Sequence, residues 1–252
     1  MTMNAIDYRC YVNDSGYRRF DLQLIEWIDQ DSITSLKQAK SITGSFSKPS
    51  KMPCCGYGLP TSICNVGGKL VDVVGSVCEG CYANKGFYKL FESTVLPAQH
   101  KRLEGLDDPL WIDAIVYQIN RLKVGDTEYF RWHDSGDLIS IIHLDKIVQV
   151  CTLTPTVKHW LPTREYKLVN DYMDMITSYN VVYDNGPLPN NLVIRLSAHM
   201  VDQDPPKNSH NLPTSTVVTS GYTCPASDQD NQCLDCRDCW SRSVDNVAYS
   251  YH

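Results

Sequence analysis

Two groups of cysteines carry most of the potential chemistry of this 252-residue sequence. In the first group, Cys78 and Cys81 are three positions apart and Cys64 lies further upstream. Three thiolates from one segment can bind three irons of a [4Fe–4S] cluster and leave the fourth iron open to a substrate or a cofactor. A fourth protein ligand would close that position, and Cys54 and Cys55 are candidates for it. The sequence leaves open which of Cys54, Cys55 and Cys64 are ligands.

The second group lies in a polar, turn-rich segment near the end of the sequence. Its members are separated by eight, two and two residues: Cys224, Cys233, Cys236 and Cys239. Four thiolates in a short loop suit either tetrahedral zinc or a [4Fe–4S] cluster, and the run resembles that of bacterial ferredoxins. We expect a metal here, with iron–sulfur favoured and zinc as the alternative. A site with four protein ligands has no open position, so its role would be structural or electron-relaying.

Composition limits the class of protein. Eleven cysteines, an odd number, in a chain without an apolar secretory segment argue against a disulfide framework and favour metal binding. A net charge of −6 argues against a broadly cationic nucleic-acid-binding protein, although a local basic groove remains open. No run of about eighteen apolar residues is present, so no membrane span is expected. We expect a cytoplasmic protein, in the host cytoplasm if it is phage-encoded.

The elements that must position these residues alternate between strand and helix over residues 128–198. This alternation predicts an α/β fold with right-handed crossovers and a parallel sheet. The first fifty residues read as a peripheral layer, with a strand or short helix at Phe20–Ile28. Helices are expected at 107–122, 140–153 and 164–179, and strands at 128–133, 157–163, 191–198, 215–220 and 246–252.

Polar residues follow the expected strands, where α/β proteins place their chemistry. His133 and Asp134, with Asp137, could form a mononuclear metal or acid/base site, or could simply order the loop by hydrogen bonds. Arg164 could bind a carboxylate or phosphate, or could pair with Glu165 or Asp134. We take His133, Asp134 and Arg164 as candidate catalytic residues.

Four further residues occupy the expected strands and helices. Arg195 lies inside an apolar strand, so its charge needs a partner, either in the barrel interior or in a salt bridge. Trp132 and Trp160 hold matching positions on neighbouring strands and are expected in the core. Cys151 falls on the apolar stripe of its helix and is expected to be a small core residue.

Two motifs resemble those of radical S-adenosylmethionine (SAM) enzymes. "VCEGCYA" resembles their cysteine loop, with Tyr82 as the aromatic residue behind the last thiolate, and "SGDLISIIHLDKIVQV" resembles their second, glycine-containing signature. The resemblance implies that Ser135, Gly136 and Asp137 position SAM, with Tyr82 and Arg195 also near the cofactor. The sequence departs from the usual loop because its third cysteine position is occupied by Val74, so Cys64 would have to substitute.

A longer set of motifs, from "KMPCCGYGLPTSICNVGGKL" to "HWLPTRE", looks like the phage gene product 88 family over residues 40–252. That resemblance implies a partial (β/α) barrel of radical-SAM type with a Cys-rich C-terminal extension. The expected parts are a peripheral segment at 1–50, a barrel core at 51–220 and a metal-binding segment at 221–252.

The combined prediction is an iron–sulfur enzyme that cleaves SAM reductively and abstracts hydrogen from a substrate. It would need SAM, an electron donor and one or two [4Fe–4S] clusters, and a nucleotide or nucleic acid is a candidate substrate. One alternative is a non-catalytic, metal-stabilised binding module whose sites are closed by protein thiolates. Another is an iron–sulfur protein that uses its open iron for non-radical chemistry.

Overall fold

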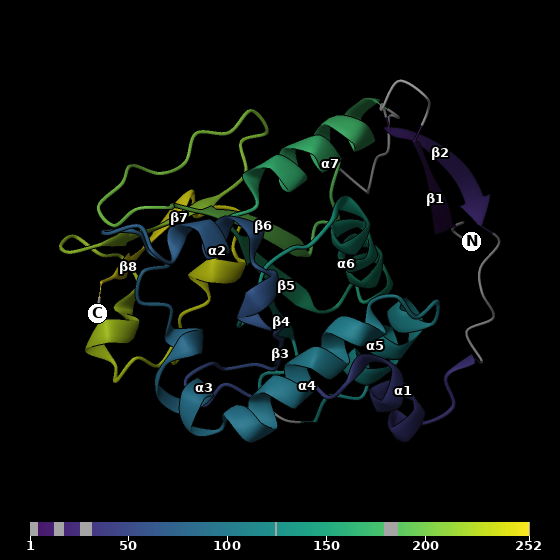
Figure 1. Ribbon diagram of the computed structural model, residues 1–252, viewed down its shortest axis with the longest axis horizontal. Coiled ribbons are helices and arrows are strands. Elements are labelled where there is room, and N and C mark those ends of the chain that lie inside the picture. The colour runs from purple at the N-terminus through teal and green to yellow at the C-terminus, as the bar shows by residue number, and fades with distance from the viewer. Residues whose placement is uncertain (1–4, 13–17, 26–31, 124, 179–185, 252) are drawn as a thin grey trace.

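A six-stranded parallel sheet forms the centre of the computed structural model, which describes residues 5–12, 18–25, 32–123, 125–178 and 186–251 (Figure 1). The strands pair in chain order, so that β3 and β8 are the edges of the sheet. Every neighbouring pair is parallel. The strands are β3 (Gly56–Tyr57), β4 (Tyr129–Trp132), β5 (Lys158–Thr163), β6 (Leu192–Ser197), β7 (Thr214–Val218) and β8 (Asn246–Ser250).

The longer helices pack as a continuous chain of neighbours, α4 on α1, α1 on α5, α5 on α6 and α6 on α7. Ser140 starts α6 by accepting a hydrogen bond from the backbone N–H of His143 at 3.0 Å, as an N-cap residue does. The helices are α1 (Leu36–Thr43), α2 (Asn65–Leu70), α3 (Gly86–Leu90), α4 (Glu92–Gly105), α5 (Trp111–Ile119), α6 (Ile141–Leu153) and α7 (Tyr166–Ser178).

The core lies between the sheet and these helices. The predicted apolar stripe of α6 is confirmed, because Leu144, Ile147, Val148 and Cys151 are all fully buried. The predicted core positions of the strand tryptophans are confirmed as well. Trp132 packs among other aromatic rings of the main core, whereas Trp160 belongs to a second apolar cluster beside the C-terminal segment. Other large rings that are fully buried are those of Tyr57, Trp111, Phe130 and Tyr172.

The α/β class and the parallel sheet are therefore confirmed, and the strands begin and end within a few residues of their predicted bounds. The helix expected at 107–122 is shorter, since it begins at Trp111. Asp108 instead accepts a hydrogen bond from the backbone of Leu110 in the preceding turn. In the predicted C-terminal Cys-rich segment, β8 pairs with β7 and thus belongs to the sheet.

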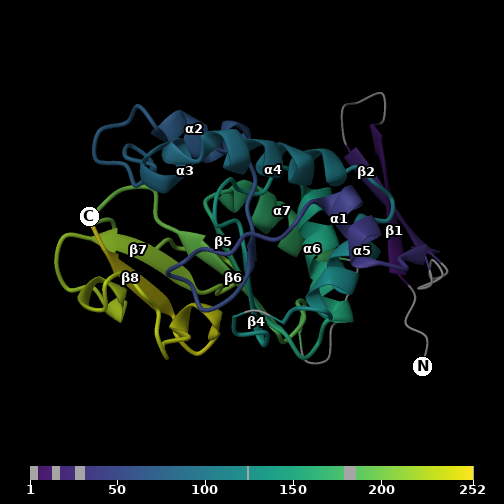
Figure 2. The ribbon, with the colours of Figure 1, turned by 90° about the horizontal axis from the view of Figure 1, so that it is seen from below.

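Strands β1 (Ala5–Val12) and β2 (Arg18–Ile25) form a separate antiparallel pair near the N-terminus. In Figures 1 and 2 this pair and the C-terminus lie at opposite ends of the molecule. The expected element at Phe20–Ile28 coincides with β2 as far as Ile25, and residues 26–28 lie outside the described residues. Within the described part of the chain, every helix is too short or too polar to cross a bilayer.

Candidate metal centre

The first group of thiols is brought together by the segment that follows β3. Cys64 stands at the start of α2, and Cys81 stands at the start of the short 3-10 helix Tyr82–Asn84. A Cβ atom on Gly67 would lie 3.2 Å from the Cβ of Cys64 and 3.5 Å from the Sγ of Cys78. Burial raises the pKa of Cys64 to about 12, and the negative charges of Asp137, Cys81 and Cys78 add to that rise. The three thiols therefore lie within electrostatic reach of one another.

Glu165, at the carboxyl end of β5, fixes the position of Cys64. Its Oε1 accepts a hydrogen bond of 2.7 Å from the backbone N–H of Val66, at the first turn of α2. Its own backbone N–H donates to Thr163 Oγ1 at 3.1 Å. The carboxylate is buried and ties the cysteine-bearing segment to the sheet. Sequence reasoning considered Glu165 only as a partner of Arg164, because no sequence signal links it to α2.

Asp137 lies beside the same thiols, after β4. Its Oδ1 accepts hydrogen bonds from Thr163 Oγ1 at 2.6 Å and from the backbone of Leu138 at 2.7 Å, and its Oδ2 accepts one from the backbone of Arg164 at 2.9 Å. Burial nevertheless raises its pKa to about 6. These bonds hold the carboxylate rigidly between the ends of β4 and β5.

Ser135 and Gly136 are packed inward against Leu59. The Ser135 hydroxyl donates to the carbonyl of Leu59 at 2.9 Å and accepts from Gln99 at 2.7 Å. Gly136 has φ = 73°, and a Cβ there would lie 2.7 Å from the Cβ of Leu59. Both residues thus shape the loop that carries Asp137.

His133 and Asp134 are also buried in this loop. His133 has φ = 52°, and the ring of His143 lies 5.3 Å from its own, centroid to centroid. Burial holds the pKa of His133 well below its usual value, so the ring is neutral. Tyr82 and Tyr88 both donate hydrogen bonds to the backbone carbonyl of Asp134, while the Tyr82 ring remains exposed. No metal-holding group that includes His133, Asp134 and Asp137 occurs among the described residues.

Arg164 stands next to the thiols from the end of β5. Its Nε lies 3.4 Å from the carbonyl of Ala198, and its positive charge lowers the pKa of Cys78 against the stronger opposing effect of burial. His199, after β6, stacks on Tyr166 with ring centroids 4.4 Å apart. Arg164 thus supplies a positive charge beside the thiols.

The second group of thiols is gathered by the C-terminal segment. Burial raises the pKa of Cys239 to about 12, and the charges of Cys224 and Cys233 contribute to that rise. Cys236 exerts the same effect on Cys224 and Cys233, so all four predicted thiols form one group. Trp240, at the end of this run, donates to the carbonyl of Phe130 in β4 at 2.9 Å and thereby anchors the segment on the sheet.

Arg195, predicted near a cofactor, is engaged by the C-terminal segment. It is fully buried in β6, and its guanidinium donates to four backbone carbonyls at 2.7–3.1 Å. Those carbonyls belong to Thr214, Asp238, Ser241 and Val244. Arg195 therefore meets the predicted need for partners through carbonyls rather than through a salt bridge, and it holds the cysteine-bearing segment against the sheet.

The thiols of both groups are donors of the type that iron–sulfur clusters and zinc both take. Among the described residues, no three His, Cys, Asp or Glu side chains form a group that could hold one metal ion. The thiolates of a [4Fe–4S] cluster each bind a different iron, so they stand further apart than four ligands on one zinc ion. Beside the second group, Arg131 Nε is buried without a partner, and N–H donors of this kind tune cluster sulfur atoms.

These features define a mixed α/β protein whose parallel sheet carries two groups of cysteines, one of them at the carboxyl ends of the strands. The family model for gene product 88 matches residues 28–246, and the chain therefore belongs to the gene product 88 family. No curated protein and no solved structure matches the chain significantly.

Proposed function

We propose that the protein is an iron–sulfur enzyme resembling radical-SAM proteins, built on a partial (β/α) barrel. The observation that carries the proposal is the meeting of Cys64, Cys78 and Cys81 with Asp137 and Arg164 at the carboxyl ends of parallel strands. This edge is where α/β folds place their reaction centres. Thiols alone would be enough for a structural site, whereas a rigid carboxylate and a guanidinium beside them suit a ligand with ammonium and carboxylate groups.

Each residue of this edge has a distinct task in the proposal. Cys64, Cys78 and Cys81 would hold a [4Fe–4S] cluster, which when bound with SAM supplies the electron for reductive cleavage and hydrogen abstraction from the substrate. Asp137 would accept hydrogen bonds from the ammonium group of SAM, because its own bonds fix its carboxylate in place. Arg164 would orient an anionic group of the substrate or of SAM.

The buried loop residues take supporting tasks. His133 stays neutral and Asp134 anchors Tyr82 and Tyr88, so both would support the loop beside the reacting groups. Ser135 and Gly136 would set the loop conformation that presents Asp137. A nucleotide or nucleic acid is the proposed substrate class, and an external electron donor is required.

A non-catalytic, metal-stabilised binding module is the second candidate. It is favoured by the inward packing of Ser135 and Gly136, which leaves little of the glycine motif free to contact a ligand. In such a module both groups of thiols would serve as structural cross-links, with zinc as the alternative metal at the C-terminal group. The two candidates differ in whether the first centre keeps an open iron.

Incubation of the reduced, anaerobically reconstituted protein with SAM separates them. The enzyme proposal predicts SAM-dependent formation of 5′-deoxyadenosine and a SAM-dependent change in the EPR signal of the cluster. Cys81→Ala should abolish both signals but retain the metal of the C-terminal group, which serves as the internal control. An unchanged EPR signal together with no 5′-deoxyadenosine would favour the binding module.

A further inference from the structure

The segment that leads into β3 runs along the C-terminal cysteine loop. The backbone N–H of Cys233 donates to the carbonyl of Lys51 at 3.3 Å, and the Sγ of Cys233 lies 3.9 Å from the Sδ of Met52. These two parts of the chain are about 180 residues apart in the sequence. Residues just before Cys54 are therefore in direct contact with the second group of thiols.

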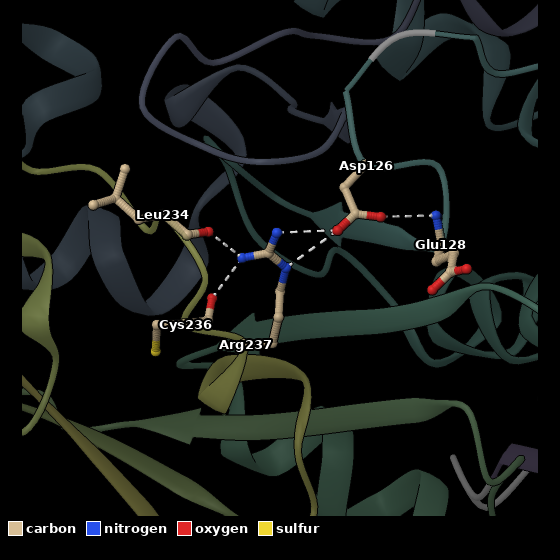
Figure 3. A network of polar contacts seen from close by, with 5 residues as sticks. All are labelled: Asp126, Glu128, Leu234, Cys236 and Arg237. Atoms are coloured by element: carbon tan, nitrogen blue, oxygen red, sulfur yellow. Dashed lines mark hydrogen bonds and ion pairs between the residues drawn. The ribbon is translucent and has the colours of Figure 1, made fainter.

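A network of polar contacts also joins Arg237 of the C-terminal cysteine loop to Asp126 (Figure 3). Asp126 pairs with Arg237 at 3.0 Å, and the Arg237 guanidinium also donates to the carbonyl of Cys236 at 2.8 Å. The backbone N–H of Asp126 donates to the carbonyl of Pro53 at 2.7 Å. Gly125, with φ = 73°, allows the close approach, since a Cβ there would lie 2.7 Å from the Pro53 oxygen.

Cys54 and Cys55 face different surroundings although they are adjacent and equally buried, each with 4% exposure. Cys54 belongs to the apolar cluster that contains Cys239 and Trp240, whereas Cys55 belongs to the main core. Cys54 is also within electrostatic reach of Cys233.

Arg131 completes the surroundings of Cys54. Its guanidinium acts electrostatically on both Cys54 and Cys233, and its Nη1 lies 3.6 Å from the Sδ of Met52. Its buried Nε has no hydrogen-bond partner among the described residues. An unpaired buried N–H is costly, and a thiolate or cluster sulfur is an acceptor that would satisfy it. A cation at this point would also offset the negative charge of several thiolates.

We propose that Cys54 is a ligand of the C-terminal metal centre, whose four ligands are then drawn from five thiols (Cys54, Cys224, Cys233, Cys236 and Cys239), and that Cys54 is not the fourth ligand of the first centre. This inference rests on the proposed function, because it requires that the C-terminal thiols hold metal. Cys54 lies two residues before the start of β3 and the other thiols precede β8, and these two strands are the edges of the sheet. The centre therefore acts as a cross-link that joins both edges of the partial barrel, while the first centre keeps an open iron.

The test uses the Cys81→Ala protein as its parent, so that the remaining metal reports the C-terminal centre alone. Cys54→Ser and the matched control Cys55→Ser are reconstituted anaerobically, and iron, zinc and sulfide per chain are measured during competition with a chelator. We expect Cys54→Ser to retain metal at least about tenfold more weakly than the parent, while Cys55→Ser behaves like the parent. Equal retention in all three proteins would overturn the inference.

A measurement without a substitution at Cys54 covers the case in which the Cys54→Ser protein fails to fold. In the parent, alkylation of each cysteine is followed by mass spectrometry at a urea concentration that exposes Cys55. Cys54 should stay unmodified until a chelator removes the metal. Alkylation of Cys54 together with Cys55, irrespective of the chelator, would refute its role as a ligand. A parent that holds no metal would refute both this inference and the proposed C-terminal centre, whereas a metal-loaded parent with reactive Cys54 refutes the inference alone.

Discussion

At the scale of single residues, the backbone conformation of His133 and Gly136 constrains the loop after β4. Gly136 and His133 both have positive φ, at 73° and 52°, within four residues of each other. A non-glycine residue in this region carries a conformational cost that the surrounding packing must offset. The loop therefore holds Asp137 in one defined position beside Cys64.

Gly136→Ala should destabilise the protein by about 3 kcal/mol, because the added Cβ combines backbone strain with a clash against Leu59. Urea unfolding of both proteins measures the difference. Gly68→Ala is the matched control, since a Cβ at Gly68 meets no atom within 4 Å and alanine favours the helix. Equal stability of the two variants would contradict the described loop.

Glu165→Gln should loosen the start of α2, because it removes the charge of a buried carboxylate that accepts from Val66. We expect a loss of about 1 kcal/mol in the free energy of unfolding. In the metal-free protein, alkylation of Cys64 should also become faster relative to that of Cys81. The exposed Glu104→Gln is the control, and an unchanged ratio of alkylation rates would show that Glu165 does not position Cys64.

At the scale of elements, periodicity and turn residues predicted most of the sheet and its helices. The stripe of α6 and the strands β4 to β6 follow directly from the spacing of apolar residues. The very short β3 could not be predicted, because two residues carry no periodicity and pairing with β4 defines the strand. The reduced length of α5 likewise depends on a local side-chain bond of Asp108 that competes with the helix.

The sequence predicted which types of residue make up the candidate site, but not most of the contacts between them. The two groups of thiols were readable from spacing, since clustered cysteines in one segment must lie near each other. Three sets of contacts join segments that lie far apart in the sequence: Glu165 with α2, Arg195 with backbone carbonyls, and Cys54 with the C-terminal group. Most of the residues joined in this way are 30 or more positions apart. Such contacts are set by tertiary packing, which local sequence patterns do not encode.

Arg195→Leu should detach the C-terminal segment from the sheet. The substitution removes the donor from four carbonyls, and we expect a loss of roughly 3 kcal/mol in stability. Limited proteolysis should cut within residues 219–245 first, which a uniform loss of stability would not produce. Lys167→Leu, at an exposed ion pair, is the control and should change stability by less than about 0.5 kcal/mol.

At the scale of the whole molecule, buried neutral histidines make stability depend on pH. Burial lowers the pKa of both His143 and His159 from 6.5 to about 3. The unfolded chain binds protons at these residues below pH 6.5, whereas the folded chain does so only near pH 3. Their contribution to stability is therefore complete above pH 6.5 and is lost as the pH falls from 6.5 toward 3.

Each of these histidines should remove about 2 kcal/mol of stability between pH 6.5 and pH 5. His159→Gln, which can retain a hydrogen bond to Thr154, should show a correspondingly smaller loss than the unmodified protein over this interval. Urea unfolding at both pH values measures the two losses. The exposed His100→Asn is the control, and a loss in His159→Gln as large as in the unmodified protein would contradict a buried neutral His159.

The most direct test of the account is the metal content of the unmodified protein after anaerobic purification and reconstitution. We predict about eight iron and eight sulfide per chain after reconstitution, from two [4Fe–4S] clusters, with the brown colour of such clusters. Loss of iron should lower the unfolding temperature, because in this proposal the metal cross-links the C-terminal segment. A colourless, iron-free protein that remains fully folded would contradict the central claim.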